Sequence, residues 1–295
     1  MSHHDHSTSR HDHSPTAFDW DEIAPILERG AEVESPLYLS AMNWIAGMVT
    51  PAGIRRVLDV GSGPGVLAPL FAGVFPHAEV TAVDASARLL ERAAARAGRA
   101  GLGDRFRTIH AELPGDLETL GEADLIWAGN SLHHLGDQGA ALAGFAGLLR
   151  PGGVIALVEG GLPLRSLPRD IGLGEPGLES RLEVANSRAF NRMRTELPDA
   201  KAEVEDWRAL LAAAGLVPSG SRTFLLDLPA PLPMTVREHL ADVFGRHHDK
   251  LSDEISAADL AVLDRLLDPE DPLGLLRRGD THLLVARTVH TARRP

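Results

Sequence analysis

Three glycines alternate with single residues directly after a short apolar run, and this arrangement constrains the fold more than any other feature of the chain. The run 55–60 has the pattern of a buried parallel strand, and Gly61, Gly63 and Gly65 follow it. A strand-to-helix turn here needs positive φ, and it lets the backbone approach a ligand without Cβ atoms in the way. The next helix N-terminus also offers unpaired N–H groups to a carboxylate. The sequence therefore predicts a ligand-binding α/β sheet.

Strand and helix patterns alternate beyond this turn, with short connections between them. Strands are predicted at 79–83, 105–110, 125–128 and 154–159, and helices at 66–74, 88–98 and 139–149. Later in the chain, a helix at 204–214, a strand at 221–228, one or two helices within 235–267 and a final strand at 281–289 complete the pattern. Such alternation indicates a parallel sheet with helices on both faces.

The alternation also divides the chain into segments. Residues 1–16 form a His-rich tail that is predicted to be disordered, and a metal-binding tail is the alternative to a merely solvated one. Two or three helices within 17–52 are expected to form an N-terminal cap before the ligand-binding core at 53–160. A cap insertion is predicted at 161–202, and 203–295 is expected to complete the core, with a helical insertion at 230–279.

Composition excludes several classes of function. The formal net charge of −12 and the isoelectric point near 5.6 disfavour nucleic acid and anionic membrane surfaces as partners. The chain has no cysteine, so its chemistry must come from histidine, carboxylates, hydroxyls or a cofactor. No apolar run approaches the roughly 20 residues that span a bilayer, and we expect a cytoplasmic protein. His247, His248 and Asp249 have poor metal-ligand spacing for a helix, so no metal site is predicted.

Acidic and polar residues follow the predicted strands where a ligand would lie. Asp59 stands two residues before Gly61, where its carboxylate can meet the ammonium of a bound amino acid. Asp84 closes the second strand about 20 residues beyond the turn, the position from which an acid binds ribose hydroxyls. Ala111 and Glu112 end the third strand and are candidates to contact adenine. The segment from Asn130 to His134 opens at the expected switch-point crevice after the fourth strand.

Together these motifs resemble the class I S-adenosylmethionine-dependent methyltransferases of the small-molecule type. The matching stretches are Val57–Gly65, Val83-Asp84, Asp124-Leu125-Ile126 leading to Leu132–Leu135, and Leu148–Gly153, in the family's order and spacing. The resemblance covers roughly residues 55–160. It implies a doubly wound, Rossmann-like sheet of seven strands with helical cap segments, in which the last strand, at 281–289, runs antiparallel.

The resemblance also implies how S-adenosylmethionine, and its product S-adenosylhomocysteine, are bound. It assigns the methionyl part to the glycine turn, the ribose to Asp84, the adenine to Ala111 and Glu112, and the cofactor edge to Asn130. The full set expected to bind the cofactor is Asp59, Gly61, Ser62, Gly63, Gly65, Asp84, Ala85, Ala111, Glu112, Asn130 and Ser131. One departure is the third strand end, His110-Ala111-Glu112, where the family often has Gly-Asp-Ala.

Methyl transfer requires alignment of a nucleophile and exclusion of water, so a dedicated base is optional. His133 or His134 is the candidate base, because both follow the fourth strand. Side chains of adjacent residues at this place are expected to point in different directions. His133 is favoured as the base. Packing or helix capping is the alternative role for both rings.

Substrate contacts are expected from Tyr38, Glu159 and Arg165, and the expected substrate is a small bacterial metabolite. Further candidates are aromatic and apolar residues that would wall a pocket, Trp20, Trp44, Phe190 and Met193, and arginines that would meet an anionic group, Arg169, Arg188 and Arg192. Hydrogen bonding to the turn at 160–161 is the alternative for Glu159. A homodimer is among the expected assemblies.

Two other functions fit the same residues. One is a protein that binds S-adenosylmethionine or S-adenosylhomocysteine for regulation or different chemistry. The other is a nicotinamide-dependent enzyme, although its glycines would follow the pattern G-x-G-x-x-G, and Val66 occupies the place of the last glycine here.

Overall fold

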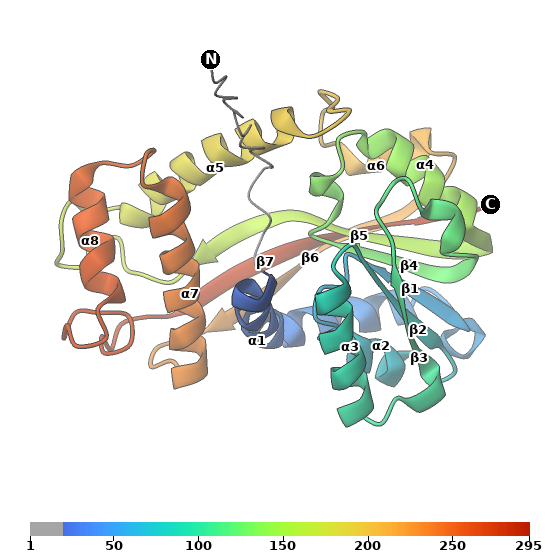
Figure 1. The fold of residues 1–295 in the computed structure, drawn as a ribbon, viewed down its shortest axis with the longest axis horizontal. Helices are drawn as coiled ribbons and strands as arrows, with labels where there is room; N and C mark the ends of the chain where they lie inside the picture. The colour runs from blue at the N-terminus through green and yellow to red at the C-terminus, as the bar shows by residue number, and fades with distance from the viewer. Residues whose placement is uncertain (1–19) are drawn as a thin grey trace, which may run out of the picture.

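A seven-stranded sheet lies between layers of helices in the computed structural model (Figure 1). The structure describes the backbone of residues 20–295 and the side chains from Ile23 onward. The predicted tail at 1–16 and the side chain of Trp20 lie outside the described residues. No helix within the described part of the chain is long and apolar enough to cross a membrane.

The strand order is β3-β2-β1-β4-β5-β7-β6. The strands are β1 (Arg56–Val60), β2 (Glu79–Asp84), β3 (Phe106–His110), β4 (Ala123–Gly129), β5 (Leu149–Arg165), β6 (Val217–Leu228) and β7 (Leu283–Arg293). The first five strands pair in parallel, and β7 runs antiparallel between β5 and β6. The predicted doubly wound sheet with an antiparallel last strand is therefore confirmed.

Helices cover both faces of this sheet. They are α1 (Trp20–Ala46), α2 (Ala68–Val74), α3 (Ala87–Arg99), α4 (Gln138–Leu148), α5 (Leu178–Glu196), α6 (Trp207–Ala213), α7 (Met234–Leu251) and α8 (Ala257–Leu267). Side chains alternate between the faces along each strand, so Val57 packs with the cluster of α1 and α2, while Leu58 packs with the cluster of α4 and α6. Both faces are consequently buried, as a parallel sheet requires.

The N-terminal segment differs from the prediction of two or three helices. It forms one helix, α1, which continues through Pro25 and Pro36. Its buried face, which includes Leu37, Met42 and Ile45, lies against the sheet core. We attribute the continuous helix to this packing, which offsets the hydrogen bonds that the two prolines cannot donate.

The fifth strand is also longer than predicted. β5 continues through residues 161–165, which were predicted to begin the cap insertion, and pairs with β7 as far as Arg165 opposite Leu284. The extended strands β5, β6 and β7 reach beneath α5 and α7 in Figure 1. A separate hydrophobic cluster packs α5, α7 and α8 together, with Leu182, Phe244 and Leu263 fully or almost fully buried.

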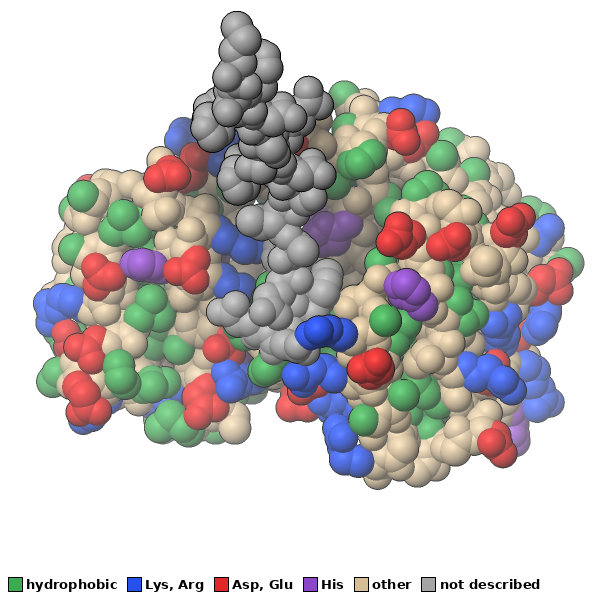
Figure 2. Space-filling model, viewed as in Figure 1, with side chains coloured by type: hydrophobic (Ala, Val, Ile, Leu, Met, Phe, Trp, Pro, Cys, Tyr) green, Lys and Arg blue, Asp and Glu red, His purple; other side chains and the backbone are tan. Residues whose placement is uncertain are grey.

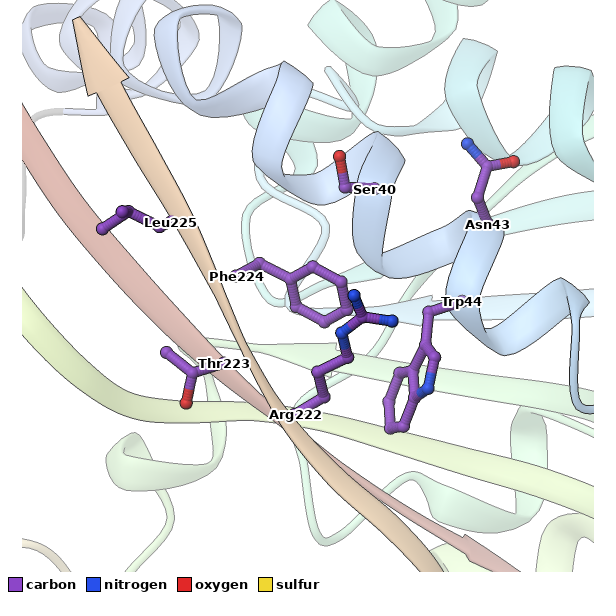
Figure 3. Close-up of a pocket in the computed structure, with 7 residues that line it drawn as sticks. All are labelled: Ser40, Asn43, Trp44, Arg222, Thr223, Phe224 and Leu225. Carbon is purple, nitrogen blue, oxygen red and sulfur yellow. The ribbon is translucent and has the colours of Figure 1, made fainter.

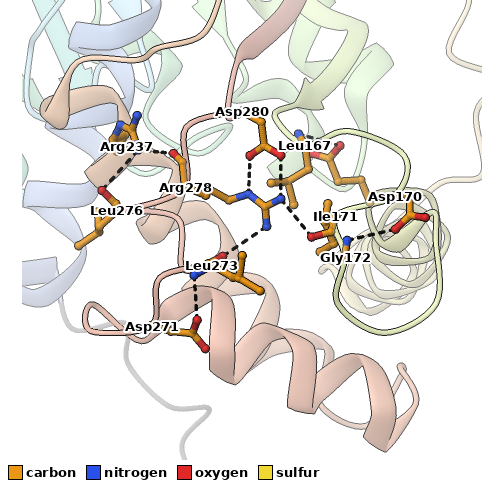
Figure 4. A network of polar contacts seen from close by, with 11 residues as sticks. Leu167, Asp170, Ile171, Gly172, Arg237, Asp271, Leu273, Leu276, Arg278 and Asp280 are labelled. Atoms are coloured by element: carbon orange, nitrogen blue, oxygen red, sulfur yellow. Dashed lines mark hydrogen bonds and ion pairs between the residues drawn. The ribbon is translucent and has the colours of Figure 1, made fainter.

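Buried arginines join the loops of this helical part (Figure 4). Arg278, with 6% of its surface exposed, forms a bidentate pair with Asp280 and donates to the carbonyl oxygens of Ile171 and Leu273. Arg237 donates to the carbonyl oxygens of Leu232, Leu276 and Arg278. The loop before β7 is thereby fixed to the segment that follows β5.

The buried guanidinium of Arg278 provides a test of this arrangement. We expect Arg278→Ala to lower the free energy of unfolding by about 2–4 kcal/mol, because it leaves two carbonyls and a carboxylate without their donor. Arg265→Ala removes a half-exposed pair with Asp271 and should change stability by less than about 1 kcal/mol. Urea denaturation of both variants measures the difference, and equal effects would contradict the structural role of Arg278.

Candidate active site

The glycine turn has the backbone conformation that its sequence predicts. Gly61, Gly63 and Gly65 have φ values of +69°, +53° and +71°. A Cβ atom on Gly65 would lie 2.5 Å from the Cβ of Ala93 in α3, whereas a Cβ on Gly63 would meet no atom within 4 Å. Gly65 is therefore required for helix packing, and Gly63 faces open space at the surface of the turn.

Asp84 joins the ends of two strands at this turn. Its carboxylate oxygens accept hydrogen bonds from the N–H of Gly63 at 2.8 Å and from the N–H of Ser86 at 2.9 Å. Burial raises the pKa of Asp84, and these backbone N–H groups oppose that shift. Ala85 is exposed beside it, and its carbonyl oxygen lies 2.9 Å from the Nε2 atom of His110.

Asp59 is buried beneath the turn without a counter-charge. Only 3% of its surface is exposed, and its Oδ2 atom has no hydrogen-bond partner among the described residues. Burial, reinforced by the nearby Asp84 carboxylate, raises the pKa of Asp59 to about 7. A buried carboxylate oxygen without a donor is costly, so the site suits a cationic ligand group that would pair with it.

The end of β4 has the backbone of a switch-point loop. Asn130 is exposed and has a φ of +50°, and its Nδ2 atom donates to the Oη atom of Tyr38 at 3.2 Å. Tyr38 donates to Glu34 at 3.0 Å, and Arg287 of β7 forms a bidentate pair with the same carboxylate at 2.7 and 2.9 Å. Burial and the Glu34 carboxylate raise the pKa of Tyr38. Tyr38 is therefore held as a neutral phenol at the edge of the site.

Sequence reasoning did not identify Glu34 or Arg287. The spacing of Glu34 and Tyr38, four residues apart on one helix, was a readable signal that they share a face. Nothing in the sequence indicates that β7 brings Arg287 to that face, because the contact joins residues 253 positions apart.

His133 is oriented by a buried carboxylate. Glu159, 6% exposed at the end of the buried part of β5, accepts from the N–H of Leu132 through Oε1 and contacts Nδ1 of His133 through Oε2, both at 3.1 Å. Because a carboxylate is an acceptor, Nδ1 carries the proton, which leaves Nε2 of the neutral ring as a free acceptor. Glu159 was predicted to contact substrate; its oxygens are instead engaged with the 132–133 segment.

The two histidine rings lie side by side, contrary to the prediction that they point in different directions. Their centroids are 4.3 Å apart, and the ring of Phe190 in α5 lies 5.5 Å from that of His133. Partial burial and the neighbouring His133 lower the pKa of His134 to about 4. His134 is thus neutral at physiological pH.

The remaining predicted residues occupy varied positions. Ser131 donates to the carbonyl oxygen of Val60, which ties the switch-point loop to the end of β1. Ala111 is buried, with its N–H bonded to the carbonyl oxygen of Asp84, and Glu112 is exposed after β3. Arg165 lies six residues beyond Glu159, about 20 Å along an extended strand, and pairs with Glu183. The structure therefore does not bring Arg165 to the other site residues.

The face that carries these groups is hollowed. Figure 2 shows a recess between the part of the molecule that contains α5, α7 and α8 and the part that contains α3 and α4, with histidine side chains beside it. A different hollow lies between α1 and the edge strand β6 (Figure 3) and is lined by Ser40, Asn43, Trp44, Arg222, Thr223, Phe224 and Leu225. Trp44 packs there against Phe224, with ring centroids 5.8 Å apart, so it does not wall the predicted substrate pocket.

No cluster of three or more metal-ligating side chains occurs among the side chains described from Ile23 onward. His248 lies 3.0 Å from Asp264 on α8 and 3.3 Å from its neighbour Asp249. His247 stacks edge-on against Phe244. His247 is thus engaged in helix packing, and His248 lies in polar contact with two aspartates.

Comparison with known proteins agrees with this geometry. A family profile described as a methyltransferase domain matches residues 58–155, which span the glycine turn, Asp84 and the His133 segment. A trans-aconitate 2-methyltransferase from Methylobacterium radiotolerans is 31% identical over 217 residues, covering 66% of this chain and 78% of that protein. The chain belongs to the class I S-adenosylmethionine-dependent methyltransferases.

Other relatives of this methyltransferase share only part of their length with it. An uncharacterized methyltransferase from Mycobacterium tuberculosis is 39% identical over 111 residues, 37% of this chain and 53% of that protein. The chain spans 28% and 53% of the first curated relatives that it matches. A crystal structure of a putative sarcosine dimethylglycine methyltransferase from Galdieria sulphuraria superposes with a TM-score of 0.50 and 19% identity, over 92% of this chain and 90% of that one, which shows a common fold.

The buried carboxyl of Asp59 makes the stability of the ligand-free methyltransferase depend on pH. Because folding raises this pKa from 3.8 to about 7, the folded state holds the proton more tightly, and this contribution to stability falls as the pH rises through that interval. At pH 8 we expect Asp59→Asn to raise the free energy of unfolding by about 2–4 kcal/mol.

Urea denaturation between pH 4 and 8 measures this effect. The exposed Asp253→Asn variant is the control, and its stability should follow the wild-type pH profile. An Asp59→Asn protein that is less stable than wild type at pH 8 would show that Asp59 is not a buried, uncompensated charge.

Proposed function

We propose that this protein transfers the methyl group of S-adenosylmethionine to a small-molecule nucleophile, an oxygen or a nitrogen. The observation that carries the proposal is the buried Asp59 carboxylate, whose Oδ2 atom has no hydrogen-bond partner among the described residues, beneath a glycine turn whose central residue, Gly63, faces open space. A cofactor with an ammonium group, a ribose and a sulfonium would find an acid, a turn that is open at Gly63 and a second acid in one place.

The residues of the turn divide the binding of the cofactor between them. Asp59 would pair with a positive group of the methionyl part, and this pairing would lower its pKa again. Asp84 would accept from the ribose hydroxyls with its remaining lone pairs, since each oxygen already holds one backbone N–H. Ala111, Glu112 and Ala85 lie at the ends of β2 and β3, where an adenine would extend. Gly61, Ser62, Gly65, Asn130 and Ser131 would complete this surface.

The bound cofactor supplies the electrophilic methyl group, and the protein aligns and deprotonates the acceptor. His133 is placed for the second task because Glu159 fixes its Nδ1–H and leaves Nε2 free to take a proton. The Glu159 carboxylate also stabilises the imidazolium that results. Phe190 packs against this ring, and Tyr38 and Asn130 border the same edge of the sheet.

A small metabolite is the substrate class that fits the recess. Segments 161–202 and 230–279, together with α1, would enclose this substrate. These three segments are the caps of the domain division proposed from the sequence. Relatives named for small acceptors support this, including the trans-aconitate 2-methyltransferase and a 27-O-demethylrifamycin SV methyltransferase from Amycolatopsis mediterranei. Action in a bacterial cytoplasm and assembly as a homodimer are further parts of the proposal, the former supported by the bacterial origin of the relatives.

Gly63→Ala tests the cofactor site most sharply. The added methyl group meets no protein atom within 4 Å, so we expect a stability loss of only about 1–2 kcal/mol from the positive φ but at least a tenfold loss of S-adenosylhomocysteine affinity. Calorimetric titration with S-adenosylmethionine, S-adenosylhomocysteine and NAD measures this.

Gly101→Ala is the matched control, because Gly101 also has a positive φ of +69° and open space but lies after α3. Its affinity for the cofactor should equal that of wild type. Binding of NAD in place of both sulfur compounds would refute the methyltransferase assignment, and equal affinity of the Gly63→Ala variant would refute the placement of the ligand.

A second experiment tests the base. With an identified acceptor and saturating cofactor, His133→Ala should lower kcat by about 10²–10⁴-fold. Glu159→Gln should lower kcat less, because His133 loses its anionic partner but keeps a hydrogen-bond acceptor at Nδ1. His134→Ala is the comparison variant and should have the smaller effect. A His133→Ala enzyme with unchanged kcat would mean that alignment alone suffices.

A further inference from the structure

One face of α7 connects the two ends of the candidate site. His239, Asp242, Arg246 and Lys250 follow one another at spacings of three or four residues, so they share a face of the helix. At one end, His239 lies within electrostatic range of Glu34, the partner of Tyr38; at the other, Lys250 lies within electrostatic range of His134. The distance from residue 239 to residue 250 along the helix is about 16 Å. Arg246 lies between them.

Arg246 is a partly buried cation that has no directly bound anion among the described side chains. Among the described residues it forms no ion pair or hydrogen bond, and its surface is only partly exposed. The acid that acts on it electrostatically, Asp242, is engaged in an ion pair with Arg29 of α1. Burial lowers the pKa of Arg246. Arginine side chains stay protonated in proteins, so Arg246 is a cation. A charge removed from water in this way is destabilising until an anion joins it.

The charged groups near Arg246 add to this excess of positive charge. Arg246 acts electrostatically on His239, His247 and Lys250. Arg194 of α5 donates to the carbonyl oxygens of His133 and Leu135, so its charge meets no carboxylate there. Glu159, the acid that acts on His134, is already bonded to His133. Two arginines on α5 and α7, Arg194 and Arg246, thus have no ion pair with a carboxylate among the described residues, in a protein whose net charge is −12.

The arginines that the sequence suggested for an anion are placed differently. Arg165 pairs with Glu183, and Arg192 pairs with Glu254 at 2.6 Å. Arg169 and Arg188 are exposed at the surface. Of the residues so far considered for anion binding, Arg246 alone combines partial burial, lack of a carboxylate partner and proximity to the candidate site.

We propose that Arg246 binds an oxyanion of the methyl acceptor, so that the substrates of this enzyme carry a carboxylate or a phosphate. The inference rests on the proposed methyltransferase function and names its substrate class. A guanidinium can bind either oxyanion through two parallel N–H···O bonds, which fixes orientation as well as charge. Held at α7, the oxyanion would position the rest of the acceptor toward His133, and a neutral analogue would leave the arginine desolvated and unpaired.

Binding to the protein saturated with S-adenosylhomocysteine tests this proposal. The probes are trans-aconitate, succinate and 4-hydroxybenzoate as carboxylates, inorganic phosphate and a phosphate monoester, phenyl phosphate, as phosphates, and trimethyl trans-aconitate as a neutral counterpart. We expect at least one anionic probe to bind by calorimetry and to bind at least tenfold more weakly to Arg246→Gln. Arg246→Lys should recover part of the loss, because it keeps the charge without the planar fork. The probe that binds identifies carboxylate or phosphate as the source of the oxyanion.

Arg99→Gln is the matched control, since Arg99 is an exposed arginine at the end of α3 and its removal changes net charge equally. It should bind the anionic probe as wild type does. The proposal is overturned if no anionic probe binds, if the neutral ester binds as tightly as the acid, or if Arg246→Gln and Arg99→Gln behave alike. If S-adenosylhomocysteine still binds in any of these cases, only the proposed substrate class is overturned. If S-adenosylhomocysteine does not bind to the wild-type protein, the methyltransferase function itself is overturned.

Discussion

Contact between the glycine turn and α3 determines how the rest of the site is built. Gly65 lies so close to Ala93 that no side chain fits between them, and this proximity holds the turn against the helix that follows β2. The N–H of Gly63 then reaches Asp84, and the neighbouring Ser86 caps α3 through the N–H of Leu89. One close approach thus fixes two strand ends, a helix N-terminus and two acids relative to one another. Any ligand at the turn meets groups that are already in place.

The same arrangement explains why burial of the Asp59 carboxylate is energetically unfavourable in the ligand-free protein. The turn covers this carboxylate without supplying a donor for its Oδ2 atom, so the ligand-free protein carries an unfavourable buried charge or takes up a proton. A cationic ligand would relieve this, and the free energy released would add to affinity. Asp59 and Arg246 differ in the sign of their charge but are alike in their surroundings. Each is a partly or fully buried charge that a ligand group of opposite charge would pair with.

Much of the fold followed from local sequence patterns, because alternating strands and helices leave few topologies open. The parallel core and the conformation of the glycine turn were predictable for this reason, whereas the antiparallel last strand was implied by the resemblance to the methyltransferase family. The single helix α1 was not, because its prolines argue for breaks that only tertiary packing overrides. The links from Glu159 to His133 and from Glu34 to Arg287 were equally hidden, since each depends on side chains that different strands bring together. Arg246 belongs to no sequence motif, and its surroundings can be known only from the position of α7 in the folded protein.

The helical cap is built on extensions of the core strands rather than on a separate hinge. Residues 161–165 of β5 pair with β7, β7 pairs with β6, and Arg278 ties the loop before β7 to Ile171. Three stretches distant in sequence therefore support one set of helices, which we propose to enclose the substrate. An engineer who wishes to exchange acceptor specificity between such enzymes would need to transplant these stretches together, because a graft of 166–202 alone would arrive without the strands and the arginine that hold it.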